Sequence, residues 1–229
     1  MSYLFEPDKT YSIPVKGERA EFPIHRIFCV GRNYAAHAAE MGAEVDRDAP
    51  FYFTKTPSAA QRTGAVIAYP PGTENFHYEI ELMIAIGKPV FCANLAQAKA
   101  AIYGYACALD MTRRDLQLAA RAKQRPWDLG KDAEQSAVFA MITKAEHFKV
   151  NDQPIYLEVN GIRKQNARLD DMIWKIDEIV SDLSKYYHLR AGDVILTGTP
   201  AGVGPVVAGD KITGGIEGLD PITLSLAER

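Results

Sequence analysis

The hydrophobic pattern of the chain is made mostly of short apolar runs, which are typical of strands. Runs of about five residues predict strands at 27–31, 51–55 and 65–69. The segment 76–87 first alternates between polar and apolar residues and then becomes continuously apolar, which indicates a strand that enters the core. A further buried strand is predicted at 103–110, with Asp110 at its end.

Fewer segments show helical spacing. A short helix is predicted from Asn33, a suitable N-cap, to Gly42, followed by a polar and mobile loop to residue 50. Other helices are predicted at 95–102, at 112 to about 123, and at 176–187. Asn160-Gly161 lies between two strand-like runs and predicts a hairpin. Many short strands with few helices favour an α+β fold with a mixed β-roll or barrel core and peripheral helices.

The first segment, 1–24, contains three prolines and is predicted to form an N-terminal arm or hairpin, while residues 25–229 form one larger domain. Hydrophobic residues make up 47% of the 229 positions, enough for a substantial core. No apolar stretch approaches the roughly 20 residues needed to span a bilayer, and no signal-type segment opens the chain. We therefore expect a cytoplasmic protein that does not interact with membranes.

Charge and cysteine content exclude two further classes. The net charge is −3, and Lys and Arg are scattered, so nucleic acid is not an expected partner. Cys29, Cys92 and Cys107 are well separated in apolar segments. A disulfide framework is not expected, and each cysteine is predicted to be a small buried side chain.

Three carboxylates suggest a cation site. Glu79 and Glu81 are two residues apart in a predicted strand, so their side chains share one face. Two like charges about 7 Å apart are costly unless a cation or a proton neutralises them. Together with Asp110 they would suit Mg²⁺ or Mn²⁺ better than Zn²⁺. The simpler alternative is that Glu79 and Glu81 form a solvated strand face and that Asp110 caps a helix beginning at Met111.

Other residues admit both a functional and an ordinary interpretation. His37 and Glu40 share a helix face at i,i+3, where a carboxylate could orient an imidazole base, or where an exposed pair could simply be solvated. Lys131 could be an ordinary surface lysine. Gly198 and Thr199 end a predicted strand, and they could bind a carboxylate or form only a tight connection. No nucleotide-binding glycine motif is present, so a nucleotide is not expected.

Four segments together resemble a known family. Residues 31–42 (GRNYAAHAAEMG), 77–82 (HYEIEL), 108–117 (ALDMTRRDLQ) and 196–205 (LTGTPAGVGP) resemble the fumarylacetoacetate hydrolase family, in order and from about Arg26 to the C-terminus. Within it the chain is most similar to the short acylpyruvases, including bacterial fumarylpyruvate hydrolases. The resemblance implies the β-roll of the family's C-terminal domain with a lid helix, and a homodimer. It also favours the cation interpretation of Glu79, Glu81 and Asp110, with Mg²⁺ expected and Mn²⁺ or Ca²⁺ possible in its place.

The resemblance further implies roles and an activity. His37 is expected to be the general base, Glu40 its orienting partner, and Lys131 a cation for the substrate. The expected substrate contacts are Tyr34, Arg114, Gln117, Gly198 and Thr199. The implied reaction is Mg²⁺-dependent cleavage of an acylpyruvate, with fumarylpyruvate giving fumarate and pyruvate.

Two alternatives to this activity stay open. The first is an oxaloacetate decarboxylase or an oxo-acid isomerase or hydratase of the same family, and the second is a non-catalytic oxo-acid-binding protein with a structural cation. The acyl group is not determined by the sequence. Lys55, Arg47 and Arg62 are candidates to pair with a second substrate carboxylate.

Overall fold

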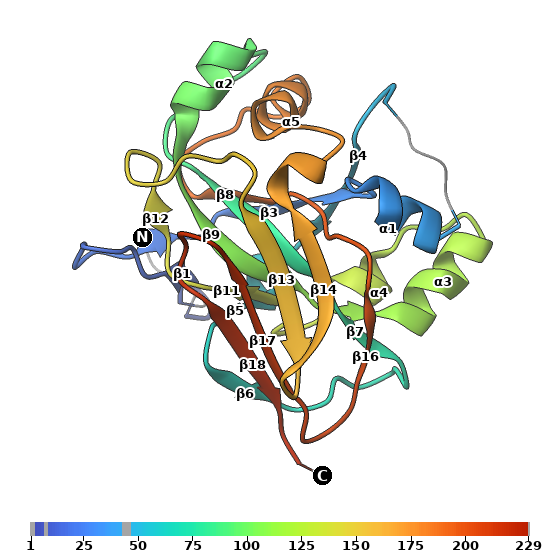
Figure 1. The fold of residues 1–229 in the computed structure, drawn as a ribbon. Helices are drawn as coiled ribbons and strands as arrows, with labels where there is room; N and C mark the ends of the chain where they lie inside the picture. The colour runs from blue at the N-terminus through green and yellow to red at the C-terminus, as the bar shows by residue number, and fades with distance from the viewer. Residues whose placement is uncertain (1–2, 7–8, 43–46, 229) are drawn as a thin grey trace.

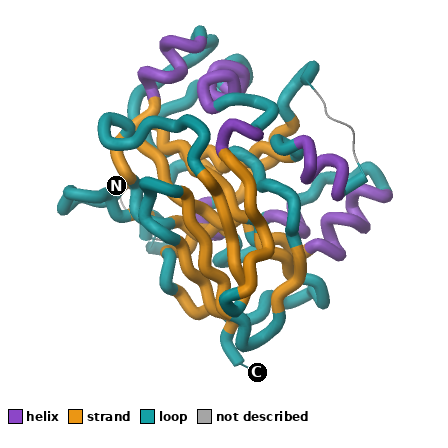
Figure 2. The backbone as a smooth tube through the Cα atoms, viewed as in Figure 1, coloured by secondary structure: helices purple, strands orange, loops and turns teal. Residues whose placement is uncertain are grey.

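The computed structural model describes residues 3–6, 9–42 and 47–228. Strands form the body of the molecule and helices lie at its periphery, as Figure 2 shows. Two helices pack together at one end of the sheets, and three others gather at one side (Figure 1). The predicted α+β class with a curled mixed sheet and peripheral helices is confirmed.

The largest sheet has eight strands and mixes parallel with antiparallel pairs. Its main path runs β4-β3-β15-β8-β9-β11-β5, and β12 also pairs with β9. The strands are β3 (Arg26–Gly31), β4 (Phe51–Lys55), β5 (Ala60–Arg62), β8 (Ile80–Ile86), β9 (Ile102–Asp110), β11 (Ala137–Phe139), β12 (Thr143–Lys144) and β15 (Asp193–Leu196). Every residue of β8 is buried, as its continuous apolar run predicts. The adjacent β8 and β9 therefore form the centre of the core.

A five-stranded sheet packs over this centre, in the order β14-β13-β17-β18-β6. Its strands are β6 (Ala65–Ile67), β13 (Pro154–Val159), β14 (Ile162–Arg168), β17 (Lys211–Ile216) and β18 (Ile222–Leu226). The predicted hairpin is confirmed, because Asn160 and Gly161, both at positive φ (51° and 77°), connect β13 to β14. This is the backbone conformation that an Asn-Gly pair tolerates and that matches the twist of the strands.

Two small sheets complete the strand content. One contains β7 (Phe76–Tyr78), β10 (Thr112–Arg113) and β16 (Gly204–Val206), and the other pairs β1 (Ser12–Ile13) with β2 (Phe22–Pro23). The β1–β2 pair lies inside the predicted N-terminal arm, and Ile13 and Phe22 are buried in the core on the other face of the large sheet. The boundary between arm and domain at residues 24 and 25 stays a prediction.

The helices are short and correct several predicted bounds. They are α1 (Ala35–Glu40), α2 (Leu95–Ala101), α3 (Arg114–Ala122), α4 (Asp128–Lys131) and α5 (Ile176–Leu183), with 3₁₀ turns at Pro57–Ala59 and Leu169–Asp171. Tyr34, not Asn33, is the N-cap of α1. The Asn33 amide instead donates to the carbonyls of Trp174 and Thr197. None of the helices in the described ranges is long and apolar enough to cross a membrane.

The sequence pattern predicted one strand at 76–87, but the structure divides this segment into two strands. Glu79 separates β7 from β8, because β7 joins the three-stranded sheet whereas β8 belongs to the large one. Similarly, α3 begins at Arg114 and not at Thr112, since Thr112 and Arg113 pair with β7. Segments that change sheets in this way produce a corner in the fold beside Glu79 and Asp110.

Two further predictions concern the burial of the cysteines and the loop that follows α1. Cys29 and Cys107 are buried as predicted, but Cys92 is exposed. Cys92 has a φ of 49° in a turn between β8 and α2, so its side chain does not join the core. Residues 43–46 of the predicted mobile loop lie outside the described residues, and its mobility is therefore untested.

Candidate active site and metal centre

Three carboxylates meet at the corner between the sheets. Glu81 is on β8, Asp110 ends the neighbouring β9, and the Asp110 N–H donates to the Glu79 carbonyl at 2.9 Å. One carboxylate oxygen from each residue lies within 4.8 Å of the other two. The three residues are between 0% and 3% exposed. A solvated strand face is therefore excluded, and Asp110 does not cap a helix at Met111.

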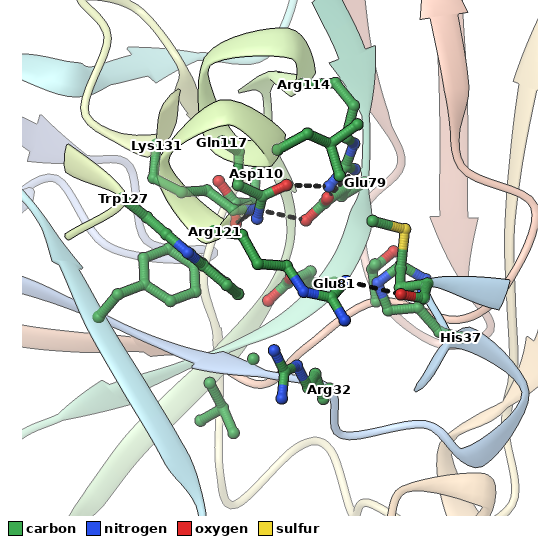
Figure 3. A pocket seen from close by; sticks show the side chains of 16 residues that line it. Arg32, His37, Glu79, Glu81, Asp110, Arg114, Gln117, Arg121, Trp127 and Lys131 are labelled. Atoms are coloured by element: carbon green, nitrogen blue, oxygen red, sulfur yellow. Dashed lines mark hydrogen bonds and ion pairs between the residues drawn. The ribbon is translucent and has the colours of Figure 1, made fainter. Parts of the chain in front are cut away.

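Lys131 and Arg114 neutralise part of this cluster. Lys131 Nζ donates to Glu79 Oε2 at 2.7 Å, to Asp110 Oδ2 at 2.6 Å and to Thr112 Oγ1 at 2.8 Å. Arg114 donates to the other oxygen of Glu79. Lys131 is only 3% exposed, so it is not a surface lysine. Figure 3 shows both cations beside Glu79 and Asp110.

The short helix α4, which the sequence pattern did not predict, brings Lys131 to the cluster. It packs closely on α3, where a Cβ on Gly130 would lie 2.8 Å from the backbone nitrogen of Gln117. Only glycine permits that approach without displacing α3. The position of Lys131 therefore depends on the residue before it.

A second lysine, Lys55, contacts Asp110. Its Nζ is 2.9 Å from Asp110 Oδ1 and donates to Ser136 Oγ at 2.8 Å and to the Met111 carbonyl at 3.2 Å. Lys55 is 2% exposed, so the suggestion that it could reach a second substrate carboxylate is wrong. It instead forms a buried ion pair with Asp110 of the carboxylate cluster.

The buried charges shift the pKa values of the cluster in opposite directions. Burial opposes ionisation of Glu79, but Lys131 and Arg114 outweigh it and hold the pKa of Glu79 below its usual range. Burial, together with the charges of Asp110 and Glu79, raises the pKa of Glu81 well above its usual range. Lys131 keeps its proton because Asp110 and Glu79 outweigh its own burial and raise its pKa.

The donor set fits a divalent cation. All candidate ligand atoms are carboxylate oxygens, and their mutual distances of up to 4.8 Å suit a cation with oxygen bonds of about 2.0–2.6 Å. Asp110 Oδ1 is buried and makes no hydrogen bond of good geometry within the described residues, although Lys55 is close. Glu81 accepts one backbone hydrogen bond, from the Gly198 N–H at 2.7 Å. Its carboxylate also lies close to the carboxylates of Asp110 and Glu79. Glu81 forms no ion pair within the described residues, so a cation at this place would give its carboxylate a positive partner.

His37 and Glu40 interact as the helical spacing predicts. The distance from His37 Nδ1 to Glu40 Oε2 is 3.1 Å, which directs the other ring nitrogen, Nε2, away from Glu40. Glu40 also accepts from the Gly202 N–H, at 3.1 Å and 3.2 Å to its two oxygens. His37 is 6% exposed and lines the same pocket as the three carboxylates. Helix α1 thus forms one wall of this pocket, which supports its role in the site but does not test its movement as a lid.

The remaining predicted contacts separate into two groups. Gln117 and Thr199 line the pocket, where Gln117 Oε1 accepts from Arg114 and Thr199 Oγ1 accepts from Gln165 Nε2 at 2.8 Å. Gly198 is not available as expected, because its N–H is bound to Glu81. Tyr34 is buried in the core, outside the pocket lining, and its hydroxyl has no partner within the described residues.

Several pocket residues were missed at the sequence level. Arg32, Arg121, Phe53 and Trp127 all line the pocket. Arg121 could have been found, because Arg114, Gln117 and Arg121 recur at the spacing of one helix face. Arg32 follows β3 directly, and nothing in the local pattern indicates its direction.

Comparison with known proteins agrees with this geometry. The family model of the fumarylacetoacetate (FAA) hydrolase C-terminal domain matches residues 26–226. A fumarylpyruvate hydrolase from Ralstonia sp. is 54% identical over 188 residues, which cover 81% of this chain and 98% of that protein. The mitochondrial oxaloacetate tautomerase FAHD1 of Homo sapiens is 40% identical over 201 residues, covering 87% of this chain and 90% of that protein.

A solved structure is similar over its full length. The crystal structure of fumarylpyruvate hydrolase from Pseudomonas aeruginosa in complex with Mn²⁺ and pyruvate has a TM-score of 0.95, with 42% identity and complete coverage of both chains. The matched fold, the matched family model and the four sequence motifs all lead to one assignment. The chain belongs to the fumarylacetoacetate hydrolase family.

Proposed function

We propose that this protein is a metal-dependent hydrolase that cleaves the C–C bond of an acylpyruvate, with fumarylpyruvate giving fumarate and pyruvate. The observation that carries the proposal is one pocket containing both a buried three-carboxylate cluster and an oriented histidine, His37. Similarity to fumarylpyruvate hydrolases in sequence and in fold supports the choice of substrate.

We infer that Glu79, Glu81 and Asp110 hold Mg²⁺, since three carboxylates with open positions are typical of sites for hard cations. Mn²⁺ could replace it, as the similar structure in complex with Mn²⁺ suggests. When bound, the cation would act as a Lewis acid on the oxo-acid end of the substrate. Gly198 acts here as a positioning residue, because its N–H holds Glu81.

The chain's own groups supply the proton transfers. His37 Nε2 accepts a proton from the attacking water, while Glu40 on Nδ1 holds the ring and stabilises the imidazolium. Water adds to the acyl carbonyl, and the bond between this carbon and the adjacent methylene breaks. The electron pair passes to the pyruvate fragment, which is released after a proton from His37 or Lys131 reaches its methylene carbon.

Three further side chains would position the substrate. Arg114 can bind the 2-oxo acid carboxylate, because a guanidinium offers several donors in a plane. Gln117 lies next to it and can hold an oxo group or the attacking water. Thr199 lines the same pocket and can donate its hydroxyl hydrogen.

The test is a substrate panel with metal-depleted protein to which Mg²⁺ or Mn²⁺ is returned. Fumarylpyruvate, acetylpyruvate and oxaloacetate are compared at equal enzyme concentration, by loss of enol absorbance and by enzymatic assay of pyruvate. We expect metal-dependent turnover of fumarylpyruvate with equal amounts of fumarate and pyruvate. Absence of pyruvate from both acylpyruvates would contradict the proposal.

A second candidate is favoured by the names of several relatives. Proteins 36% to 40% identical to this chain, from Escherichia coli to Homo sapiens, are oxaloacetate tautomerases. Tautomerisation moves a proton without adding water, so a hydrolytic histidine is less important to it. The oxaloacetate arm of the panel, followed by the enol and keto signals in NMR spectra, separates the two activities.

We also propose a homodimer, on the family resemblance. Sedimentation equilibrium of the purified protein tests it, and a single species at the mass of one 25.3 kDa chain would contradict it.

A further inference from the structure

The pocket continues beyond the carboxylate cluster to a second group of cations. Arg32 and Arg121 both line it, and in Figure 3 their side chains extend into the space between Trp127 and His37. The same two arginines also line an adjoining cavity of about 490 Å³ with Phe51 and Trp127. The pocket therefore has two chemically different ends, which we call the carboxylate end (Glu79, Glu81, Asp110) and the arginine end (Arg32, Arg121).

The cations of the carboxylate end are already matched to carboxylates. Arg114 and Lys131 contact Glu79, and Lys131 and Lys55 contact Asp110. They can assist in binding the oxo-acid end of a substrate, but they do not add an anion site at the other end of the pocket. A group that extends away from this cluster meets the arginine end.

Arg32 is held in a specific orientation. Its backbone has a φ of 60°, a left-handed conformation that residues with a Cβ adopt rarely and that is often retained at functional sites. Its guanidinium carbon lies 5.6 Å from the ring centre of Phe51 and 5.8 Å from that of Trp127. The two rings are themselves 4.8 Å apart. This arrangement places a cation beside flat apolar surfaces.

Arg121 lies on the face of α3 that also carries Arg114 and Gln117 into the pocket. Its Nη1 donates to the Met41 carbonyl at 2.6 Å and its Nη2 to the Gly42 carbonyl at 3.3 Å. A guanidinium has five N–H donors, so these two bonds leave donors for a ligand. Arg121 therefore connects the end of α1 with the arginine end of the pocket.

Arg47 and Arg62, the two arginines that the sequence offers as partners of a second carboxylate, lie elsewhere. Arg47 packs at 4.5 Å on the ring of Trp174 and is 3.5 Å from Glu178. Arg62 pairs with Glu21 at 2.5 Å. Neither lines the pocket. These contacts remove both as partners of a substrate bound at the carboxylate cluster.

We propose that Arg32 and Arg121, beside the rings of Phe51 and Trp127, bind the second carboxylate of a dianionic substrate and so select acyl groups that end in a carboxylate. The inference rests on the proposed function and names the specificity-determining residues of the same pocket. A flat, conjugated four-carbon acyl chain can lie against the aromatic rings, and its terminal carboxylate can accept bonds from the guanidinium groups. An acetyl group reaches neither arginine.

The test compares two substrates in two variants. For wild type, Arg32→Met and Arg121→Met, kcat/KM is measured with fumarylpyruvate and with acetylpyruvate. Loss of a charge-assisted hydrogen bond should lower the ratio of kcat/KM for fumarylpyruvate to kcat/KM for acetylpyruvate by roughly 30-fold in each variant. Arg163→Met is the matched control, because Arg163 is exposed and lines neither the pocket nor the adjoining cavity, and its ratio should equal that of wild type.

A binding measurement separates this inference from the proposed function. Fumarate and crotonate have the same planar chain, but crotonate carries a methyl group in place of the second carboxylate. By calorimetry, wild type should prefer fumarate, and both arginine variants should lose this preference. If wild type hydrolyses neither substrate, the proposed function fails while the binding arm still tests the arginines. An unchanged substrate ratio or an unchanged fumarate preference in either variant overturns the proposal.

Discussion

The two ends of the pocket are built in different ways. The carboxylate end is formed by strand termini, its three acidic residues are at most 3% exposed, and their positions follow from the ladder between β8 and β9. The arginine end is formed by a residue after β3, a residue of helix α3 and an aromatic cluster, all of them partly open to solvent. A rigid sheet suits groups that must hold a cation at fixed distances, whereas loops and helix surfaces can change with the acyl group. The difference suggests that chemistry and specificity are separable in this fold.

The largest effect is expected from Glu81→Gln. The amide can still accept from the Gly198 N–H, but it removes one carboxylate from the cluster. We expect metal-dependent turnover to fall at least about 10³-fold, because the cation contributes several kcal/mol to the barrier. Activity and Mn²⁺ binding, the latter by electron paramagnetic resonance, are measured on the same preparation.

Glu74→Gln is the control for this variant, since Glu74 is an exposed acidic residue shortly before β7 and outside the carboxylate cluster. Circular dichroism and thermal unfolding confirm that both variants fold. Wild-type Mn²⁺ affinity in Glu81→Gln would show that Glu81 is not a ligand.

Lys55→Met should affect stability more than a surface ion pair can. The substitution removes the lysine 2.9 Å from Asp110 Oδ1 and leaves that buried oxygen without a cation, although Lys131 still contacts Oδ2, so we expect a cost of about 3 kcal/mol in the metal-free protein. Mg²⁺ should recover part of this loss, so the rise in Tm on adding Mg²⁺ should exceed that of wild type. Lys144→Met removes a partly exposed pair with Glu18 and should cost no more than about 1 kcal/mol. Equal losses of unfolding free energy in Lys55→Met and Lys144→Met would contradict a stabilising role for the contact between Lys55 and Asp110.

His37→Ala tests the division between hydrolysis and enolate chemistry. Removal of the general base should lower kcat for fumarylpyruvate roughly 10²-fold to 10³-fold. The kcat for tautomerisation of oxaloacetate, a reaction that needs no attacking water, should fall less. Glu40→Gln keeps a group able to bond to His37 but removes its charge, and we expect a smaller loss of kcat than in His37→Ala. Equal losses for both substrates in His37→Ala would assign His37 to enolate chemistry instead.

The smallest effect is expected at the arginine end, from Trp127→Leu. The ring lies 5.8 Å from the guanidinium carbon of Arg32, and loss of such a contact costs roughly 0.5–1 kcal/mol. KM for fumarylpyruvate should rise by about two-fold to five-fold, with Mn²⁺ affinity as in wild type. A change in Mn²⁺ affinity as large as that in Glu81→Gln would show that the two ends are not separable.

Several features of the site were accessible from the sequence because they depend on neighbouring residues. The i,i+3 spacing of His37 and Glu40 predicted their contact, and the structure places them 3.1 Å apart. The apolar run that ends at Asp110 predicted a buried strand with a carboxylate at its end. The Asn160-Gly161 turn was likewise determined by local backbone preferences.

Other features could not be predicted because they depend on which segments pack together. Lys131 and Glu79 are 52 residues apart along the chain, and their contact requires both the unpredicted helix α4 and its packing on α3. The break at Glu79 arises because β7 and β8 pair with different strands. No local pattern contains that information.

The sequence by itself determined the strand-rich class and the contact of His37 with Glu40, because backbone geometry over a few residues settles both. Only the tertiary structure decided that Asp110 and Lys55 complete the carboxylate end, and that Arg32 and Arg121 meet at the other end. Those contacts depend on strand register and on side-chain packing across the whole core, where each position is set by many distant residues at once.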